Sequence, residues 1–382
     1  MAPSYGGPAT ALPGIAKGLL DAGVSVDVAT IINPGEQADP AQAVSDEAHG
    51  FRRFVFARTT RPYRISLPLG RWLDERVREY ALVHVHAVFT YSSRAGCRSA
   101  FSNAVPYIVR PLGILNRWGM EQRRPLAKKF FFKFIEKPLL DAAAGMHYTS
   151  ETEAEEAARL SIRAPARIVP LGIDLGPFER LPGREIFVSR FFPDSHAGGP
   201  VILFLSRLDP KKGIDLLLDA FQSMLSSHPR ARLVIAGDGD AAFVRSLKER
   251  AAQLGLGGSV VWPGFLAGEM KLAALAAADV FCLPSHSENF GMALLEAMAA
   301  GKACVSSDQV ALGVEAARSS AVKLVTRDAA SIAKALEDVM ASADRRSQLG
   351  ATARTYAREH HGIAAVGTRL AAWYEEIVGA KR

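Results

Sequence analysis

The sequence has few cysteines and no long apolar run, and each scarcity argues against a class of protein. Only three cysteines occur among 382 residues, at positions 97, 282 and 304, and their spacing matches no metal-binding motif. A disulfide framework is therefore not expected, and a reducing compartment is favoured. No uninterrupted apolar segment approaches the ~20 residues that span a bilayer. The first ten residues, MAPSYGGPAT, lack the basic and apolar regions of a signal peptide. We expect a cytoplasmic protein.

Acidic residues are in the minority, with 39 Asp and Glu against 46 Lys and Arg, a net charge of +7. Such a balance suits an anionic partner, which includes nucleotides, phosphates, acidic lipids and nucleic acids, and it does not choose among them. The composition, 49% hydrophobic and 22% charged, is that of a soluble globular protein. The length predicts two domains or one large domain.

Short β-branched runs alternate with helical patterns along the whole chain, which predicts parallel, doubly wound α/β sheets. The expected strands are 24–30, 52–57, 82–88, 106–111, 145–150, 167–172, 200–206, 232–237, 259–264, 279–284 and 303–307. A Pro- and Gly-rich stretch around 180–200 interrupts the pattern. We predict a first Rossmann-like domain over 1–188 and a second over 189–360, with a C-terminal helix in 361–382 that crosses back to the first domain. Ligands of such sheets bind at the carboxyl ends of strands, here facing an interdomain cleft.

The start of the chain is unusual for this architecture. The Gly-rich turn SYGGP (4–8) leads into a helical pattern, and such a turn normally follows a strand, yet only three residues precede it. We expect the first domain to lack its first strand, so that the strand at 24–30 lies beside a gap in the sheet. The alternative is a sheet that begins at residue 24.

The stretch SHSENFGMALLEAMAAGKACV (285–305) places two carboxylates around an apolar helix. Glu288 precedes the helix, and Glu296 is the one charged residue within 291–301. The helix start offers free N–H groups and a positive dipole end to a phosphate. A carboxylate in a cleft can accept hydrogen bonds from two hydroxyls, such as those of a ribose. The alternative is that both are ordinary solvated acids; the apolar helix and the strand–loop–helix context favour a site.

The stretch LSRLDPKKGIDLLLDAF (205–221) supplies matching cations. Arg207 follows a strand, and Lys212 precedes a glycine at a helix start. Arginine offers a forked donor to phosphate oxygens and lysine a compact positive charge. The pair can neutralise a diphosphate leaving group without a metal ion. A basic loop on a solvated surface is the alternative for this stretch taken alone.

Taken together, these motifs resemble those of the group 1 (family four) retaining glycosyltransferases, which have the two-domain GT-B fold. The matching segments, spread over nearly the whole chain, are SYGGP (4–8), PLGID (170–174), SRLDPKKG (206–213), IAGDGD (235–240), WPGF (262–265) and SENFGMALLEAMAAGKACV (287–305). The resemblance implies transfer from a nucleotide sugar, retaining and independent of metal, with no further cofactor. No residue is an evident covalent nucleophile.

The same resemblance assigns roles to individual residues. Arg207 and Lys212 would hold the donor diphosphate, Glu288 would contact the donor sugar, and Glu296 would take the ribose hydroxyls. The further residues expected at the donor are Gly7, Asn289, Phe290, Gly291 and Phe265. We count Glu288, Arg207 and Lys212 as catalytic.

Two departures from the family pattern concern the acceptor side. Many members have a histidine after the fifth strand, where this chain has Arg110 followed by Pro-Leu-Gly, as in subfamilies that build cell-surface polysaccharides. The usual Gly-Gly-x-x-Glu turn reads ALGVEAA at 311–317. His84 and His86 lie on one face near a strand's end, with no further metal ligands evident. We place His86 and Arg110 on the acceptor side; for His86 the alternative is a packed core histidine.

The segment 116–140 carries seven basic residues against two acidic ones, interleaved with Trp118 and four phenylalanines. Lys129, Lys133 and Lys137 are spaced to share one helix face. A basic aromatic helix can rest on anionic lipid, so peripheral association with the inner face of the cell membrane is one interpretation. A domain helix with buried Phe and solvated Lys is the other. No recognised module supports nucleic-acid binding.

The leading hypothesis is thus a hexosyltransferase acting on a lipid-linked or oligosaccharide acceptor in surface polysaccharide synthesis. Two alternatives remain: a sugar-nucleotide epimerase of similar fold, and a catalytically degenerate subunit that binds nucleotide sugars. Release of free nucleotide only in the presence of acceptor would distinguish transfer from epimerisation.

Overall fold

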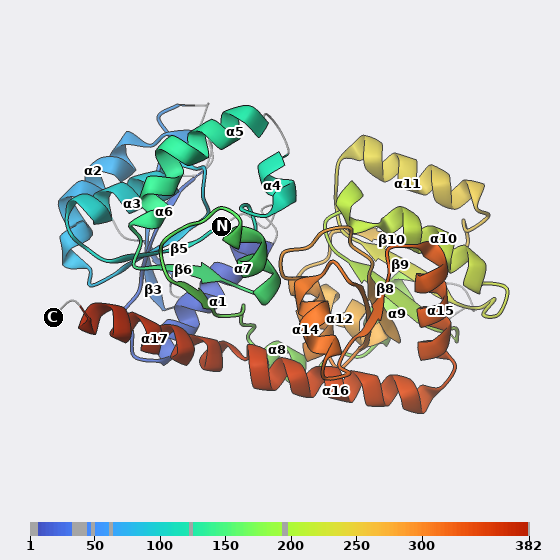
Figure 1. Cartoon of the computed structure of the whole chain (residues 1–382). Helices are drawn as coiled ribbons and strands as arrows, with labels where there is room; N and C mark the ends of the chain where they lie inside the picture. The colour runs from blue at the N-terminus through green and yellow to red at the C-terminus, as the bar shows by residue number, and fades with distance from the viewer. Residues whose placement is uncertain are drawn as a thin grey trace. The chain divides into compact units, whose positions relative to one another are not determined.

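The computed structural model describes residues 7–32, 44–46, 50–60, 64–121, 125–192 and 198–380 (Figure 1). The chain forms two compact units. The first contains residues up to Gly172 together with the C-terminal segment from Ile363, and the second spans Ile173–Gly362. The sequence placed the change of domain near residue 188, whereas in the structure the second unit already begins at Ile173. Arg354 of helix α16 (Ala343–His361) donates to the carbonyls of Phe178 and Glu179 at 3.1 and 3.2 Å.

The strands of the first unit form two separate sheets. The smaller has the order β1-β3-β2, with β1 and β3 parallel and β2 antiparallel to β3. Its strands are β1 (Asp27–Ile31), β3 (Phe51–Phe56) and β2 (Val44–Asp46). The larger is fully parallel, in the order β4-β5-β6-β7. Its strands are β4 (Val83–His86), β5 (Tyr107–Arg110), β6 (Gly145–Tyr148) and β7 (Ala166–Ile168).

Among the described strands, β1 and β4 each lie at the edge of their own sheet. The strand predicted at 24–30 corresponds to β1, whose partner among the described strands is β3, and the gap beside it stays a prediction. The related expectation, that no strand precedes residue 4, lies outside the described residues. The strands at 44–46 and 323–325 were not predicted; both are three residues long and lack an alternating pattern.

The two faces of the larger sheet differ in chemistry because side chains alternate along each strand. Val85, Val109 and Met146 join an apolar core beneath α3 (Tyr91–Ser102) and its neighbours. The opposite face carries His84, His86, Arg110 and His147, together with Gly145, against which the indole of Trp373 packs. One side of this sheet is thus hydrophobic core, and the other is a polar layer.

The C-terminal helix α17 (Ile363–Gly379) covers this polar layer and packs against α1 (Gly7–Asp21). Their contact requires glycine on both sides. A Cβ on Gly367 would collide with the carbonyl group of Gly18, and one on Gly18 would lie 2.5 Å from the carbonyl oxygen of Ile363. Side chains at this crossing would force the helices apart.

The second unit is built on one six-stranded parallel sheet, in the order β10-β9-β8-β11-β12-β13. The strands are β8 (Val201–Leu205), β9 (Arg232–Ala236), β10 (Val260–Gly264), β11 (Val280–Leu283), β12 (Ala303–Ser307) and β13 (Lys323–Val325). Strands β9, β11 and β12 are buried along their whole length, as in parallel sheets covered on both faces. The helices between them are α10 (Ile214–Met224), α11 (Ala241–Gln253), α12 (Gly268–Ala277), α13 (Met292–Ala299), α14 (Ala311–Ala317) and α15 (Ala329–Met340).

The order of these strands reverses between β8 and β11. From β8 the chain adds β9 and β10 on one side, and then returns to place β11, β12 and β13 on the other. A reversal of this kind leaves a crevice at the carboxyl ends of the two flanking strands, where ligands of open α/β sheets bind. The loops after β8 and β11 carry the two motifs singled out in the sequence.

Candidate active site

The loops after β8 and β11 contact each other directly. The backbone N–H of His286 donates to the carbonyl oxygen of Lys211 at 2.7 Å. Lys211 and Lys212 lie in the short 3₁₀ helix Pro210–Lys212, which Asp209 caps through a 3.1 Å hydrogen bond from the N–H of Lys211. Arg207, the other predicted cation, lies in the same loop and is exposed. The structure therefore brings both motifs to one point at the sheet's reversal.

Lys212 forms an ion pair with Glu288, joining the two motifs side chain to side chain. The Lys212 side chain is only 7% exposed and that of Glu288 is 22% exposed. Burying the lysine ammonium is tolerable because the carboxylate compensates its charge. Burial, followed by the nearby Lys212 charge, lowers the pKa of Lys211. The charges of Lys212, Arg207, Glu288 and Asp209 all act on Lys211, so three cations lie close to two carboxylates, and the excess of positive charge suits a further anion.

Backbone geometry places Glu288 at the entrance of α13. Its N–H donates to the carbonyl of Gln309 at 3.0 Å, and Glu288 forms an isolated parallel bridge with Val310. Gly291, which precedes the helix, has φ of 104°, and a Cβ there would lie 2.7 Å from the side chain of Val310. Only glycine fits this position without displacing the 310 loop. The turn therefore presents the helix N-terminus and Glu288 in one fixed geometry.

Phe290 and Asn289 complete this loop in different ways. Phe290 is buried, with its ring 5.6 Å from that of His361, so its side chain anchors the loop and only its backbone faces the helix start. Asn289 is half-buried. Phe265 follows β10 and is 54% exposed. Gly7, also predicted for the donor, begins α1 in the first unit.

Glu296 has a partner that the sequence did not predict. Its Oε1 lies 2.7 Å from Nζ of Lys271, on α12, and the two side chains are 15% and 24% exposed. The prediction of a solitary carboxylate on an apolar helix is therefore incomplete, because the compensating charge comes from a neighbouring helix. Lys271 is the one basic residue between 268 and 277, and that isolation was the available signal.

In the first unit, His84 belongs to a chain of three hydrogen bonds beneath α17. Nε2 of His147 lies 2.7 Å from the carbonyl oxygen of Val169 and must donate to it, so Nδ1 of His147 is an acceptor. Nε2 of His84, 3.2 Å away, then donates to that Nδ1, and the hydroxyl of Tyr374 donates to Nδ1 of His84 at 2.5 Å. Both imidazoles are neutral: burial lowers the pKa of His84 well below 6.5 and that of His147 to about 3. His84 is a satisfied structural residue.

His86 is turned instead toward Arg110. Nη1 of Arg110 lies 3.4 Å from Nδ1 of His86, and Arg110 itself is 3% exposed. Burial, followed by the Arg110 charge, lowers the pKa of His86 well below 6.5. Because arginine can only donate, Nδ1 of His86 accepts and its Nε2 carries the hydrogen. The two predicted acceptor-side residues are therefore neighbours, on adjacent strands in register.

The loops that follow β4 and β5 are held in left-handed conformations. Ala87 and Phe89 have φ of 78° and 61°, and Leu112 and Gly113 have 59° and 72°. Such conformations persist only where surrounding contacts impose them, and they cluster at functional sites. Here the carboxylate of Glu153 accepts hydrogen bonds from the N–H of Gly113 at 2.6 Å and from the N–H and hydroxyl of Thr149 at 2.8 Å. These hydrogen bonds tie the loop after β5 to the loop after β6.

The basic segment 116–140 is a series of helical pieces. They are α4 (Arg117–Glu121), α5 (Pro125–Phe131), a π-helical turn (Phe132–Glu136) and α6 (Lys137–Asp141). Leu126, Phe130 and Phe134, spaced by four residues, are 82%, 65% and 57% exposed, and the last two rings lie 4.6 Å apart. We call these three residues the exposed ridge. Lys129 and Lys133 are exposed beside it.

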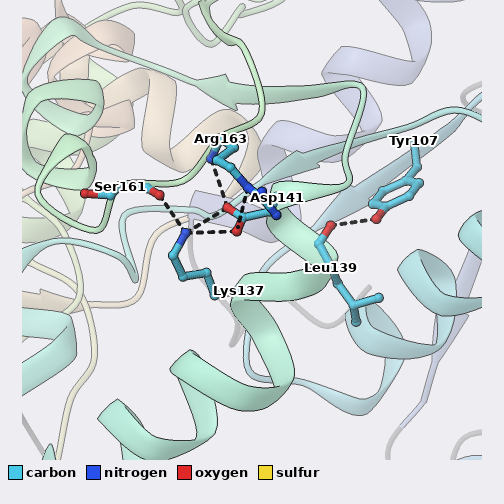
Figure 2. A network of polar contacts seen from close by, with 6 residues as sticks. All are labelled: Tyr107, Lys137, Leu139, Asp141, Ser161 and Arg163. Carbon is cyan, nitrogen blue, oxygen red and sulfur yellow. Dashed lines mark hydrogen bonds and ion pairs between the residues drawn. The ribbon is translucent and has the colours of Figure 1, made fainter.

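Lys137 leaves the face on which the sequence placed it. A π-helical turn inserts one residue and rotates the subsequent part of the helix by roughly 100°. Lys137 therefore points inward, donating to the carboxylate of Asp141 at 2.8 and 3.0 Å and to the carbonyl of Ser161 at 2.6 Å (Figure 2). Arg163 donates to the same carboxylate, and Tyr107 donates to the carbonyl of Leu139. This network fastens the base of the segment to the body of the unit.

A hollow of about 530 Å³ lies beside the exposed ridge in the first unit. Its lining is predominantly basic and apolar: Arg117, Met120, Glu121, Lys129, Phe132, Arg159 and Leu160. In the part of the chain that the structure describes, no group of three or more His, Cys, Asp or Glu side chains is arranged to hold a metal ion. Within the same residues no helix has the length and apolar character needed to cross a membrane.

Comparison with known families matches both halves of the chain. Residues 6–172 match the model of the glycosyl transferase 4-like domain, and residues 187–356 match that of the glycosyl transferases group 1. The chain belongs to the group 1 glycosyltransferases. Its fold is the two-domain GT-B fold: HepE of Anabaena, solved in complex with UDP, is similar with a TM-score of 0.79 at 19% identity over 98% of this chain and 97% of that one.

Two curated relatives are similar over part of their length. A phosphatidyl-myo-inositol mannosyltransferase of Mycolicibacterium smegmatis is 32% identical over 216 residues, which are 56% of this chain and 52% of the relative. An alpha-monoglucosyldiacylglycerol synthase of Streptococcus pneumoniae is 30% identical over 178 residues, 46% of this chain and 40% of the relative. The chain thus spans about half or less of these relatives.

Proposed function

We propose that the chain transfers a hexosyl group from a nucleoside-diphosphate sugar to a lipid-linked or oligosaccharide acceptor, with retention of configuration and without a metal ion. The observation that carries the proposal is the meeting of Arg207, Lys212 and Glu288 at the reversal of the second sheet. Cations placed there can neutralise the diphosphate that leaves, and stabilising developing charge with preorganised groups is a large catalytic term. The similarity to HepE, solved with UDP, supports a nucleotide sugar as donor.

Each part of the donor has a matching group in this arrangement. Arg207, Lys212 and the N–H groups at the start of α13 would take the diphosphate. Glu288 would accept hydrogen bonds from the sugar hydroxyls, and Glu296 from the ribose hydroxyls. The phosphate would replace Glu288 as the partner of Lys212, which frees that carboxylate for the sugar. The proposal also assigns to the donor Gly7, Asn289, Phe265 and the backbone of Phe290 and Gly291.

The acceptor belongs on the first unit in this proposal, at His86 and Arg110. The relatives named for acting on phosphatidyl-myo-inositol and on a glucosyldiacylglycerol support a lipid-bearing acceptor. Assembly of a cell-surface polysaccharide is the role we propose for the product.

Donor binding tests the site directly. In calorimetric titrations of UDP- and GDP-sugars, Lys212→Ala and Glu296→Ala should each weaken binding by at least tenfold. Lys334→Ala, which removes an exposed lysine from α15 of the same unit, is the matched control and should bind as the parent does. Equal affinity in parent, Lys212→Ala and Glu296→Ala would show that the donor site is elsewhere.

Turnover separates the proposed transfer from its alternatives. A transferase releases nucleotide diphosphate in proportion to added acceptor, and EDTA leaves the rate unchanged. An epimerase would convert the donor without acceptor, and a degenerate subunit would bind the donor without turnover. The anomeric coupling constant of the product sugar, measured by NMR, tests retention.

We also propose that the exposed ridge rests on the inner face of the cell membrane. Leu126, Phe130 and Phe134 present apolar side chains to the outside, and Lys129 and Lys133 lie beside them. Exposed aromatic residues flanked by lysine suit an anionic bilayer surface, where each basic residue contributes about 1 kcal/mol. The Lys137–Asp141–Arg163 network holds the base of this segment, so that binding need not order it.

Vesicle flotation provides the test, with a matched control in the same unit. The double variant Phe130→Ser/Phe134→Ser should lose binding to vesicles containing phosphatidylglycerol. Phe101→Ser removes another phenylalanine of comparable exposure, 59%, at the end of α3, and should bind normally. Binding should decline with salt. Binding that is equal on neutral vesicles, or unaffected by the double variant, would contradict this assignment.

A further inference from the structure

Arg110 is a buried cation for which the described residues supply no carboxylate partner. The residue is 3% exposed, and its Nε has no hydrogen-bond partner among the described residues. Its one side-chain hydrogen bond there is the 3.4 Å approach of Nη1 to the neutral imidazole of His86. An arginine taken out of water normally has an anion beside it, because an uncompensated buried charge is strongly unfavourable.

The acidic group whose charge acts on Arg110 is already engaged elsewhere. Glu153 acts on Arg110 through its charge, yet both of its oxygens accept hydrogen bonds from Gly113 and Thr149. Burial, only partly offset by Glu153, lowers the pKa of Arg110 to about 10. The unit therefore contains a desolvated guanidinium with unused donors.

Arg110 lies where a ligand of this sheet would bind. It is the last residue of β5, at the carboxyl edge, and the strained loops of Ala87 and Leu112 follow β4 and β5. Its carbonyl accepts from the N–H of Ala87 at 2.9 Å, which fixes the strand end. Beside it, Nε2 of His86 carries a hydrogen that is directed to no acceptor within the described part of the chain. That N–H points away from the guanidinium, because Arg110 is bonded to the other ring nitrogen, so the unused donors at this edge are those of Arg110.

We propose that Arg110, oriented by His86, binds a phosphate group carried by the acceptor. This inference rests on the proposed transfer and deepens it, since it gives the acceptor a chemical class: a phosphorylated sugar or a lipid diphosphate. The guanidinium fork matches two phosphate oxygens, and His86 orients it by accepting from Nη1 through Nδ1. The bound anion supplies the charge compensation that Arg110 lacks.

Inorganic phosphate is the probe for the first test, on the full chain. The background is Arg207→Met/Lys212→Met, which removes the cations assigned to the donor. In this background phosphate should raise the unfolding temperature in a saturable manner. Adding Arg110→Met should weaken the apparent phosphate affinity at least tenfold. Adding Arg71→Met, which removes an exposed arginine of the first unit, should leave it unchanged.

The unliganded stability supplies an independent readout. Because Arg110→Met removes an uncompensated charge and retains apolar volume, the phosphate-free variant should unfold at a higher temperature than its parent. An arginine whose role was structural would give the opposite shift. Arg110→Lys keeps the charge without the fork, and should retain phosphate binding several-fold weaker. An unchanged phosphate response in Arg110→Met, or a lowered unfolding temperature, would overturn the proposal.

Acceptor competition then separates the two sources of phosphate. Glucose 6-phosphate and a short isoprenyl diphosphate in detergent micelles are each titrated against the parent and Arg110→Met, with glucose and the isoprenyl alcohol as controls. The tighter phosphorylated probe identifies the source. Phosphate binding does not depend on turnover, so a chain that binds phosphate through Arg110 but transfers no sugar refutes the proposed function alone. If the chain transfers sugar to a neutral acceptor, and Arg110→Met leaves the rate of that transfer unchanged, the phosphate site is refuted and the proposed transfer is not.

Discussion

Removing one member of the Lys212–Glu288 pair should destabilise the second unit more than removing both. Lys212 is 7% exposed and cannot reach water easily, whereas Glu288 is 22% exposed. Deleting one partner of a fully buried ion pair costs about 3–5 kcal/mol, and exposed pairs contribute about 0–1 kcal/mol. For this partly buried pair we expect Glu288→Gln to lower the free energy of unfolding by about 2–3 kcal/mol, because the buried ammonium of Lys212 is left without a compensating charge. Lys212→Met should lower the free energy of unfolding by less, about 1–2 kcal/mol, because the more exposed carboxylate of Glu288 can be hydrated.

The double variant Lys212→Met/Glu288→Gln should recover most of this loss, because no uncompensated charge remains. For a unit of this size 1 kcal/mol corresponds to about 2–4 °C in the unfolding temperature, so the Glu288→Gln change is measurable. Urea unfolding followed by hydrogen exchange and mass spectrometry, read in peptides of β8 and β11, reports this unit separately. Losses that simply add in the double variant would refute the pairing as an energetic unit.

The polar contacts and the helix crossing support three further predictions. His84 and His147 lie among His86, Arg110 and Tyr374, and the pKa values of both imidazoles are lowered in the folded state. As pH falls below about 6.5, the unfolded chain therefore binds protons at these histidines before the folded chain does. Each histidine should therefore lower the stability as pH falls below about 6.5, by up to roughly 1.4 kcal/mol per pH unit, and for His147 this loss continues to about pH 3. His84→Phe should reduce the slope in urea titrations, and an unchanged slope would be inconsistent with a neutral His84. Lys271→Met should destabilise by about 1–3 kcal/mol in calorimetry and Lys271→Arg by less, while equal effects would mean that the charge does not matter. Gly367→Val should release α17, seen as proteolysis near residue 363, whereas Ala365→Val, on the exposed side of the helix, should not.

Much of the fold could be predicted from the sequence because it depends on local pattern. The apolar runs at 232–237 and 279–284 became β9 and β11, since a strand buried on both faces must be apolar throughout. The cations and carboxylates of the second unit were also recognisable, because each follows a strand in the chain. Their meeting in space follows from the parallel arrangement of β8 and β11.

Local pattern determined less about the segment 116–140. Its basic and aromatic composition was evident, but the π-helical turn at 132–136 depends on how Phe132 and Glu136 enter the core. That turn decides which lysines are exposed and directs Lys137 to Asp141. The spacing of residues along an ideal helix could not predict this change of face.

The sequence by itself determined the two α/β units, most of their strands and the motifs at the strand ends, because hydrophobic periodicity and glycine positions act over a few residues. Only the tertiary structure decided which charges are compensated. Lys271 reaches Glu296 from another helix, Tyr374 and His147 satisfy His84, and Arg110 is left without a carboxylate among the described residues. The physical reason is that electrostatic energy depends on burial and on distance through space, and neither can be read from spacing along the chain.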